Sequence, residues 1–172
     1  NCLFDILKFY CFFEVFILNI LIAAAGSGKR MGGEGNKLFL KVLDKTLIEW
    51  TLDAVVKAEL ITWIGIVGQE VDKRRILSIL ENYPKKIAFI EGGQTRQESI
   101  EKGLAAVPTD KCKFVLIHDG ARCLVKSSLI DQCAREVQIN QAIIAANRVT
   151  STIKQVNIDG NIVRTLDRFL AK

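Results

Sequence analysis

The sequence predicts an α/β domain: a Rossmann-like, mostly parallel sheet with helices on both faces, and a protruding β-hairpin arm. Short apolar runs alternate along the chain with segments whose apolar residues recur at helical spacing, which indicates parallel strands joined by crossover helices. The chain has 172 residues, 49% of them hydrophobic and 25% charged, so it can build one globular domain with a core. After residue 147 the alternation gives way to a β-rich stretch, which predicts the arm.

Each predicted strand is a short apolar run, and each predicted helix is recognised by its apolar stripe. The runs predict strands at residues 20–24, 63–67, 87–90, 114–117 and 142–146. The stripes predict helices over residues 46–60, 76–80, 100–107 and 129–137. Ser127 or Ser128 is expected to cap the last of these helices, because serine accepts hydrogen bonds from the first free N–H groups.

The arm is predicted from two β-rich stretches, residues 150–156 and 161–165, on either side of Asp159-Gly160. Asp-Gly between strand-like runs is a hairpin signal. A lone two-stranded hairpin is marginal in water, so it needs another surface, and a second copy of the chain can supply one. We therefore expect a homodimer formed through an arm at about residues 149–168.

Residues 1–17 are strongly apolar and aromatic and lie outside the alternating pattern. We interpret them as a non-native extension that precedes a domain at residues 18–172. A membrane tether is the alternative, but Glu14 interrupts the apolar stretch and Ala23–Ala25 belong to the ligand site that is described below. We therefore expect no membrane partner.

The net charge of +5 indicates a basic surface or a basic pocket for phosphates. Nucleic acid is not an expected partner, because the chain has no dense run of lysine and arginine. Five scattered cysteines without a C-x-x-C pair, and a single histidine, argue against a zinc site. Reduced thiols of this kind are typical of a cytoplasmic protein.

A buried apolar run passes directly into a glycine-rich basic loop, Gly26-Ser-Gly-Lys-Arg-Met-Gly-Gly-Glu-Gly-Asn-Lys37. Glycines let backbone N–H groups approach a ligand closely, and a run of such groups binds anions. The P-loop pattern does not fit, because Ala23 and Arg30 stand where it needs a glycine and a serine or threonine. Met31 replaces the third glycine of the dinucleotide fingerprint, which disfavours a nicotinamide-binding protein. The expected ligand is a polyphosphate.

The pattern Ala-Ala-Gly-x-Gly-x-Arg-Met, followed by Lys37, resembles the signature of nucleotidyltransferases. Three later segments in matching order are similar to those of the 2-C-methyl-D-erythritol 4-phosphate cytidylyltransferase family: Gly92–Ser99, Ile117–Arg122 and Arg164–Arg168. The resemblance runs from about Leu18 to the end of the chain. It implies transfer of CMP from CTP to that polyol phosphate in isoprenoid biosynthesis, with release of pyrophosphate and with Mg²⁺ as cofactor.

The same resemblance assigns the site residues. It implies transition-state stabilisation by Arg30, Lys37 and Arg168, and a magnesium ligand at Asp119. It implies an acceptor site at Asp119, Arg122, Thr152 and Arg168. It implies CTP binding by Ala23, Ala24, Ala25, Gly26, Ser27, Gly28, Lys29, Gly93, Gln94, Ser99 and Gly120.

Several alternatives stay open. Lys37 could be a surface cation and Asp119 a turn residue. The acceptor could be ribitol or glycerol phosphate, because the arm chooses between polyol phosphates. The family continues past the position of Lys172, so we expect a C-terminally truncated chain and leave open an inactive remnant. The compartment implied is the cytoplasm, or the plastid stroma for a plastid protein.

Overall fold

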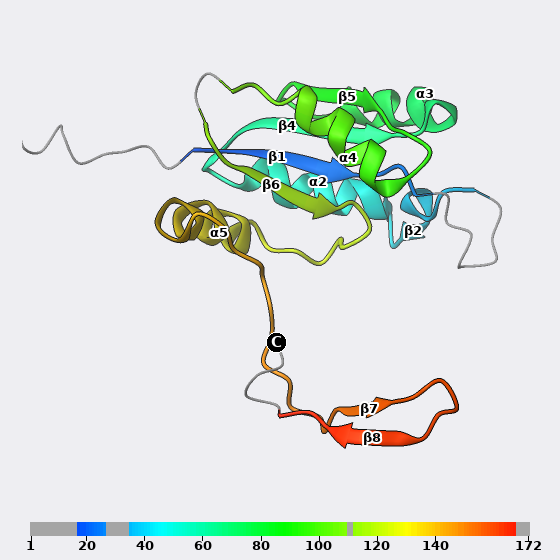
Figure 1. Ribbon diagram of the computed structural model, residues 1–172. Helices are drawn as coiled ribbons and strands as arrows, with labels where there is room; N and C mark the ends of the chain where they lie inside the picture. Colours follow the sequence, from blue (N-terminus) through cyan, green and yellow to red (C-terminus); the bar gives the residue numbers. More distant parts are fainter. Residues whose placement is uncertain (1–16, 27–34, 110–111, 168–172) are drawn as a thin grey trace, which may run out of the picture. The chain divides into compact units, whose positions relative to one another are not determined.

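The computed structural model describes residues 17–26, 35–109 and 112–167, divided between one unit that ends at Gln141 and another that begins at Ala142. The first unit is organised around a four-stranded sheet with the order β5-β4-β1-β6 (Figure 1). Its strands are β1 (Leu18–Ala23), β4 (Ile61–Gly68), β5 (Ile87–Glu91) and β6 (Val115–Asp119). All three pairings are parallel, which confirms the predicted Rossmann-like α/β class.

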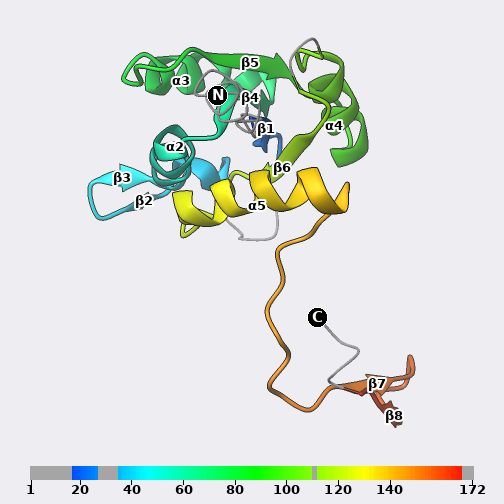
Figure 2. The same cartoon turned by 90° about the vertical axis from the view of Figure 1, so that its left-hand side faces the viewer.

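Helices cover both faces of this sheet, as the alternation predicted (Figure 2). Helices α2 (Leu47–Lys57) and α3 (Glu70–Leu80) lie on one face, and α4 (Arg96–Ala105) lies on the other. Helix α5 (Ser127–Asn140) packs beside α2. On β1 the buried side chains alternate: Ile20 and Ile22 join the core cluster with α2, whereas Leu21 lies against Gly103 of α4.

The start of α2 shows why the sequence forms this helix where it does. Thr46 and Glu49 make a capping box, in which each side chain bonds the backbone N–H of the other residue. Ile48, Leu52 and Val55 then recur at helical spacing and are fully buried. The helix is thereby fixed against the sheet, and its N-terminus lies near the ends of β1 and β6.

The strand order creates a switch point beside β1. The chain moves from β1 outward through β4 to β5, and then crosses back to place β6 on the opposite side of β1. The segments that follow β1 and β6 therefore lie at neighbouring strand ends, at the carboxyl edge of the sheet. Ligands of open α/β sheets bind in the crevice at such a point.

Two sequence-based expectations are wrong. Residues 142–146 do not form a strand, because α5 ends at Gln141 with a φ of 62° and the following segment is exposed, with Ile144 at 88%. An apolar run becomes a strand only beside a partner strand, and none pairs with it in the described part of the chain. The expected serine cap of α5 is also absent: Lys126 occupies the cap position without a side-chain bond, and Ser127 is already helical.

Two small elements between β1 and α2 were not predicted. A single 3₁₀ turn, η2 (Lys37–Phe39), is followed by an antiparallel pair, β2 (Lys41–Val42) and β3 (Lys45–Thr46). Leu43 turns this pair with a positive φ of 59°, an unusual conformation for a branched side chain. The turn η2 buries Leu38 and Phe39, which fixes the backbone that follows Lys37.

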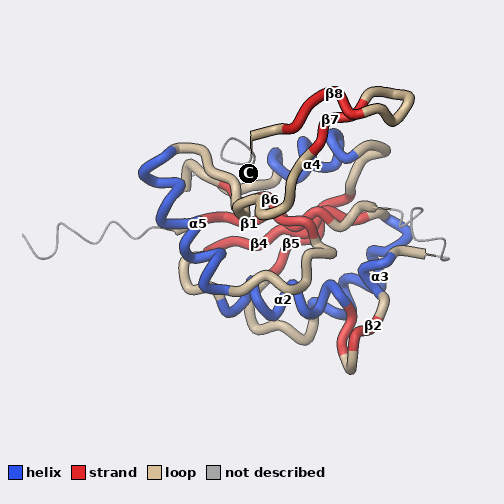
Figure 3. The backbone as a smooth tube through the Cα atoms, turned by 90° about the horizontal axis from the view of Figure 1, so that it is seen from below, coloured by secondary structure: helices blue, strands red, loops and turns tan. Residues whose placement is uncertain are grey.

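The second unit contains the predicted hairpin, whose two strands are drawn in red in Figure 3. Strands β7 (Lys154–Val156) and β8 (Ile162–Thr165) pair in antiparallel fashion. The Asn157 side chain accepts hydrogen bonds from the N–H groups of Asp159 and Asn161, and Gly160 supplies a φ of +83°. The described residues include no helix long and apolar enough to cross a membrane. The predicted extension at residues 1–17 lies outside the described residues, except for Ile17.

Candidate functional site

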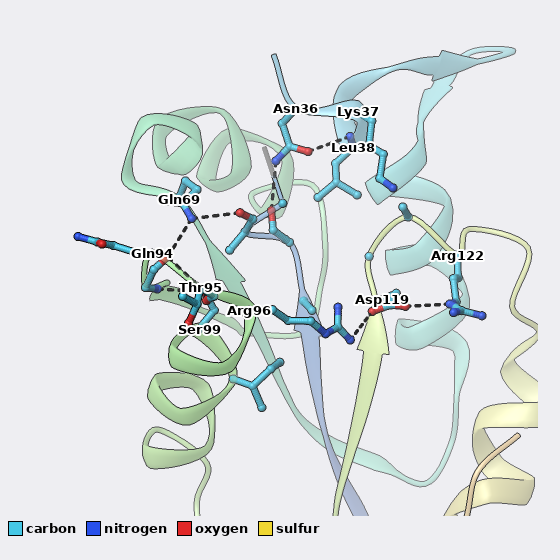
Figure 4. A pocket seen from close by; sticks show the side chains of 18 residues that line it. Asn36, Lys37, Leu38, Gln69, Gln94, Thr95, Arg96, Ser99, Asp119 and Arg122 are labelled. Atoms are coloured by element: carbon cyan, nitrogen blue, oxygen red, sulfur yellow. Dashed lines mark hydrogen bonds and ion pairs between the residues drawn. The ribbon is translucent and has the colours of Figure 1, made fainter. Parts of the chain in front are cut away.

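A cavity of about 800 Å³ opens at the carboxyl edge of the parallel sheet (Figure 4). The ends of the four strands and the segments after them line it: residues 23–26 and 36–38 at or after β1, Gln69 after β4, residues 93–96, 99 and 100 after β5, and residues 119–122 at or after β6. The sequence predicted that segments after three separate strands would converge on one crevice, and the cavity has this arrangement. Its size is within the ordinary range for small-molecule sites.

Asn36 anchors the segment that leaves β1. Its Nδ2 donates to the carbonyl oxygen of Ala24 at 3.1 Å and to Oδ2 of Asp72 at 2.8 Å. Its Oδ1 accepts from the N–H of Leu38 at 3.1 Å and so caps η2. Lys37 lies between these contacts, half-buried, and lines the cavity. The ammonium group is therefore carried by a backbone that is bonded on both sides.

The segment after β5 is shaped by its own side chains. Thr95 and Glu98 form a capping box at the start of α4, and Oε2 of Glu98 also accepts from the N–H of Gln94 at 2.7 Å. Ser99, which is 4% exposed, accepts from the N–H of Gly93 at 3.0 Å and donates to the carbonyl of Thr95 at 2.8 Å. The N-terminus of α4 thus begins at the cavity, where helix dipoles favour anions.

Gln69 connects the segments after β1 and β5. Its Nε2 donates to the carbonyl oxygen of Ala25 at 3.0 Å and to that of Gly93 at 3.2 Å. Figure 4 shows the amide reaching from the end of β4 toward both segments.

Asp119 is paired with two arginines, one at each carboxylate oxygen. Arg96 of α4 donates to Oδ1 at 2.8 Å, and Nε of Arg122 donates to Oδ2 at 2.9 Å (Figure 4). Partial burial acts to raise the pKa of Asp119, but the hydrogen bonds and positive charges of the two arginines outweigh it, and the pKa is lowered. The carboxylate is therefore charged at neutral pH, as ion pairing or metal binding requires.

The turn after β6 is held close to β1. The N–H of Gly120 bonds the carbonyl of Ala23 at 2.9 Å, and the carbonyl of Gly120 accepts from the buried hydroxyl of Thr51 at 2.8 Å. A Cβ at position 120 would lie 3.1 Å from the Ala23 oxygen, so this close approach favours glycine. His118 lies beside Ile22 in the sheet register, and burial lowers its pKa. His118 does not line the cavity, which supports a packing role rather than a base.

The predicted site residues of the first unit fall together where the structure describes them. Ser27, Gly28, Lys29, Arg30 and Arg168 lie outside the described residues, and Thr152 belongs to the second unit, which is described by itself. The remaining predicted residues all line the cavity: Ala23, Ala24, Ala25, Gly26, Lys37, Gly93, Gln94, Ser99, Asp119, Gly120 and Arg122.

Seven cavity residues were not assigned to the site from the sequence: Asn36, Leu38, Gln69, Thr95, Arg96, Ile100 and Ala121. The polar side chains of Asn36, Gln69 and Arg96 are the ones that link site segments. Arg96 had a signal, because it is the first helical residue within the Thr95–Glu98 capping box, which places a helix start after β5. Asn36 and Gln69 act through single side-chain amides, whose partners depend on tertiary structure. No spacing rule could have identified them.

Comparison with known proteins agrees with this arrangement. The family model for IspD, 2-C-methyl-D-erythritol 4-phosphate cytidylyltransferase, matches residues 18–170. The enzyme of that name from Prochlorococcus marinus is 55% identical over 151 residues, which are 88% of this chain and 67% of that protein. The enzyme from Parasynechococcus marenigrum is 52% identical over the same share of this chain and 66% of its own length.

A solved structure shares the fold as well. The 4-diphosphocytidyl-2C-methyl-D-erythritol synthase from Anaerococcus prevotii superposes with a TM-score of 0.79 at 29% identity, over 91% of this chain and 67% of that one. The chain therefore spans about two thirds of the length of these relatives. The match over residues 18–170, the identity above 50% and the shared fold together show that this chain belongs to the 2-C-methyl-D-erythritol 4-phosphate cytidylyltransferase family.

Proposed function

We propose that the chain transfers CMP from CTP to 2-C-methyl-D-erythritol 4-phosphate, giving 4-diphosphocytidyl-2-C-methyl-D-erythritol and pyrophosphate. Family membership supports this reaction. The structural observation that carries it is the convergence of the segments after β1, β5 and β6 on one cavity. A phosphate-binding loop, a base-binding segment and an acidic residue beside arginines are the parts that nucleotidyl transfer needs.

In this reaction an oxygen of the acceptor phosphate attacks the α-phosphorus of CTP. The bond from that phosphorus to the bridging oxygen of the β-phosphate breaks, and pyrophosphate leaves. The acceptor phosphate is already an anionic nucleophile at neutral pH, so the site needs no general base. Lys37 and Arg30 place positive charge at the crowded phosphorus centre, where fixed cations lower the barrier.

Cytosine recognition falls to the segment Gly93–Ser99. The N–H groups of Gly93 and Gln94 are bonded to Ser99 and Glu98, so this backbone is rigid before a ligand arrives. The side-chain amide of Gln94 offers a donor and an acceptor, which are the groups that the polar edge of cytosine requires. A compact, glycine-containing turn leaves room for a pyrimidine rather than a purine.

Asp119 is the residue that would hold Mg²⁺. Among the described residues, no three His, Cys, Asp or Glu side chains are placed so that they could hold a metal ion together. An ion at Asp119 would therefore depend on the triphosphate for further oxygen ligands. Mg²⁺ binds through one or two carboxylates and substrate phosphates, so a single charged carboxylate beside a polyphosphate suits it. Both oxygens of Asp119 are paired with Arg96 and Arg122, so the ion would have to displace or share one of these ion pairs. When bound, it neutralises charge on the phosphate oxygens.

We assign the acceptor phosphate to Arg122. The arm forms a homodimer, in which its Thr152 and Arg168 serve the acceptor site of the partner subunit. An arginine at this point suits a phosphate because its planar fork donates two parallel bonds. We assign the reaction to the cytoplasm, or to the plastid stroma if the chain comes from a plastid.

The test is a coupled pyrophosphate-release assay with purified protein, CTP, Mg²⁺ and a panel of acceptors. We expect release with 2-C-methyl-D-erythritol 4-phosphate and much less with ribitol or glycerol phosphate. Preference for ribitol or glycerol phosphate would reassign the acceptor. Calorimetric titration is the companion measurement: CTP should bind more tightly than ATP or GTP, and equal or tighter ATP binding would contradict the assignment of Gly93–Ser99 to the base.

A further inference from the structure

The side chain of Gln69 does not do what its position in α3 would ordinarily require. Gln69 is the N-cap residue of α3, with φ −78° and ψ 148°, yet it makes no side-chain cap bond. Serine, threonine, aspartate and asparagine are preferred at this position because they accept from the first free N–H groups. The Gln69 amide is turned toward the cavity instead, and donates to the carbonyls of Ala25 and Gly93.

These two carbonyls belong to chain segments that leave different strands. Ala25 follows β1 and Gly93 follows β5, and β4 lies between those strands in the sheet. Below the amide the segments are already in contact, since a Cβ built on Gly92 would lie 3.0 Å from the Cβ of Ala25. The N–H of Gly92 also bonds the carbonyl of Gly68 at 2.8 Å. Gln69 adds a further link between the two segments, at the point where they line the cavity.

The bond to Ala25 has a direct effect on the backbone. In a trans peptide the C=O and the following N–H point in opposite directions, so holding the Ala25 carbonyl fixes the N–H of Gly26. Gly26 has no contact within 4 Å that would limit an added Cβ, so side-chain packing does not hold it. Asn36 holds the preceding carbonyl, that of Ala24. Two consecutive peptide groups are thus oriented by side-chain amides.

We propose that Gln69 is a positioning residue that couples the phosphate-binding loop after β1 to the base-binding segment after β5. A nucleoside triphosphate spans both segments, so its affinity depends on their separation and mutual orientation. A ligand that touches only one segment does not depend on the link. This inference rests on the proposed function, because it takes the triphosphate and base subsites from it.

The decisive variant is Gln69→Ser. Serine restores a preferred N-cap at unchanged backbone angles, so α3 should become no less stable, while the link between Ala25 and Gly93 is lost. If Gln69 only stabilised the fold, this substitution should not reduce the affinity for CTP. The matched control is Gln132→Ser, at an exposed position of α5 away from the cavity.

We expect the Kd for CTP to rise about tenfold in Gln69→Ser. This is about 1.4 kcal/mol, the net free energy of one to two hydrogen bonds. Cytidine and inorganic tripolyphosphate, followed by NMR titration, should bind within about twofold of wild type, since twofold is well under 1 kcal/mol. The KM for CTP should rise while kcat and the KM for the polyol phosphate stay unchanged. The melting temperature should not fall.

Hydrogen–deuterium exchange of the ligand-free protein gives a readout that needs no activity. Gln69→Ser should accelerate exchange in residues 24–26 and 92–94 together, with β1 and β4 unaffected. Unchanged CTP affinity, or equal weakening of CTP and both fragments, would overturn the coupling. Wild-type protein that exchanges and folds normally but binds no CTP would instead overturn the proposed function, and with it the nucleotide part of this inference.

Discussion

Nδ2 of Asn36 donates to Oδ2 of Asp72 at 2.8 Å, which joins the residue before Lys37 to the first turn of α3. The same asparagine caps η2 through the N–H of Leu38. The position of Lys37 is therefore set by a helix that is distant in sequence. This relationship makes Asn36 a support for the cation that we assign to the transition state.

Replacing Asn36 with alanine should lower kcat for CMP transfer by about tenfold, because misplacing a catalytic cation weakens interactions made at the reacting phosphorus. Asp72→Ala removes only one of the three Asn36 contacts and should cost less. Steady-state kinetics would measure both, with the exposed Asn140→Ala as control. Wild-type kcat in a folded Asn36→Ala variant would show that Lys37 does not need this support.

Lys37→Ala should reduce turnover by two orders of magnitude or more while leaving the protein folded. Lys37 lines the cavity and is only half-buried, so the core does not depend on it. Lys41→Ala removes the same charge from the exposed strand β2 and should have little effect. Circular dichroism would verify the fold of each variant. Equal activity of the two variants would show that Lys37 is only a surface cation.

Gly103→Ala should destabilise the protein by about 1–3 kcal/mol, although alanine is the better helix former. A Cβ at this position in α4 would clash with Cδ2 of Leu21 and lie 2.7 Å from Cγ2 of Val67. Both side chains are fully buried and cannot easily move. Urea denaturation would compare it with Ser78→Ala, an exposed change in α3 that should be neutral or slightly stabilising. Stabilisation by Gly103→Ala would contradict the close packing of α4 on the sheet.

The parallel sheet was predictable because its strands are short, mostly apolar runs of the kind that parallel sheets bury. Residues 142–146 are equally apolar, yet no pairing partner exists for them in the described structure, and the run alone could not reveal that. The position of Asp119 at the end of β6 was predictable for the same reason as the sheet. The small pair β2–β3 was not, because two-residue strands carry no periodicity.

The links between site segments were the least predictable part. Gln69 and Arg96 act on partners 23 to 44 residues away in sequence, namely Ala25, Gly93 and Asp119. Only the order of the strands in the sheet brings these residues together in space. A glutamine after a strand has many possible roles, so its amide could be assigned only from the fold.

The last prediction concerns the single histidine of the chain, His118. Burial lowers its pKa, and a backbone hydrogen bond with Arg122 and the charge of Asp119 offset this only in part. Among the described residues, nothing bonds its buried Nε2. An added proton at this nitrogen would therefore be poorly solvated.

The sign of the pH effect follows from this shift. An unfolded chain binds a proton at His118 as the pH falls below about 6.5, whereas the folded protein does so only at lower pH. The free energy of unfolding should therefore decrease from pH 7.5 to pH 5.5, by at most about 1.4 kcal/mol per pH unit. Urea titrations across this window should show the slope in wild type, and His118→Gln should flatten it even if that variant is less stable overall. Identical slopes in the two proteins would mean that His118 titrates normally in the folded state.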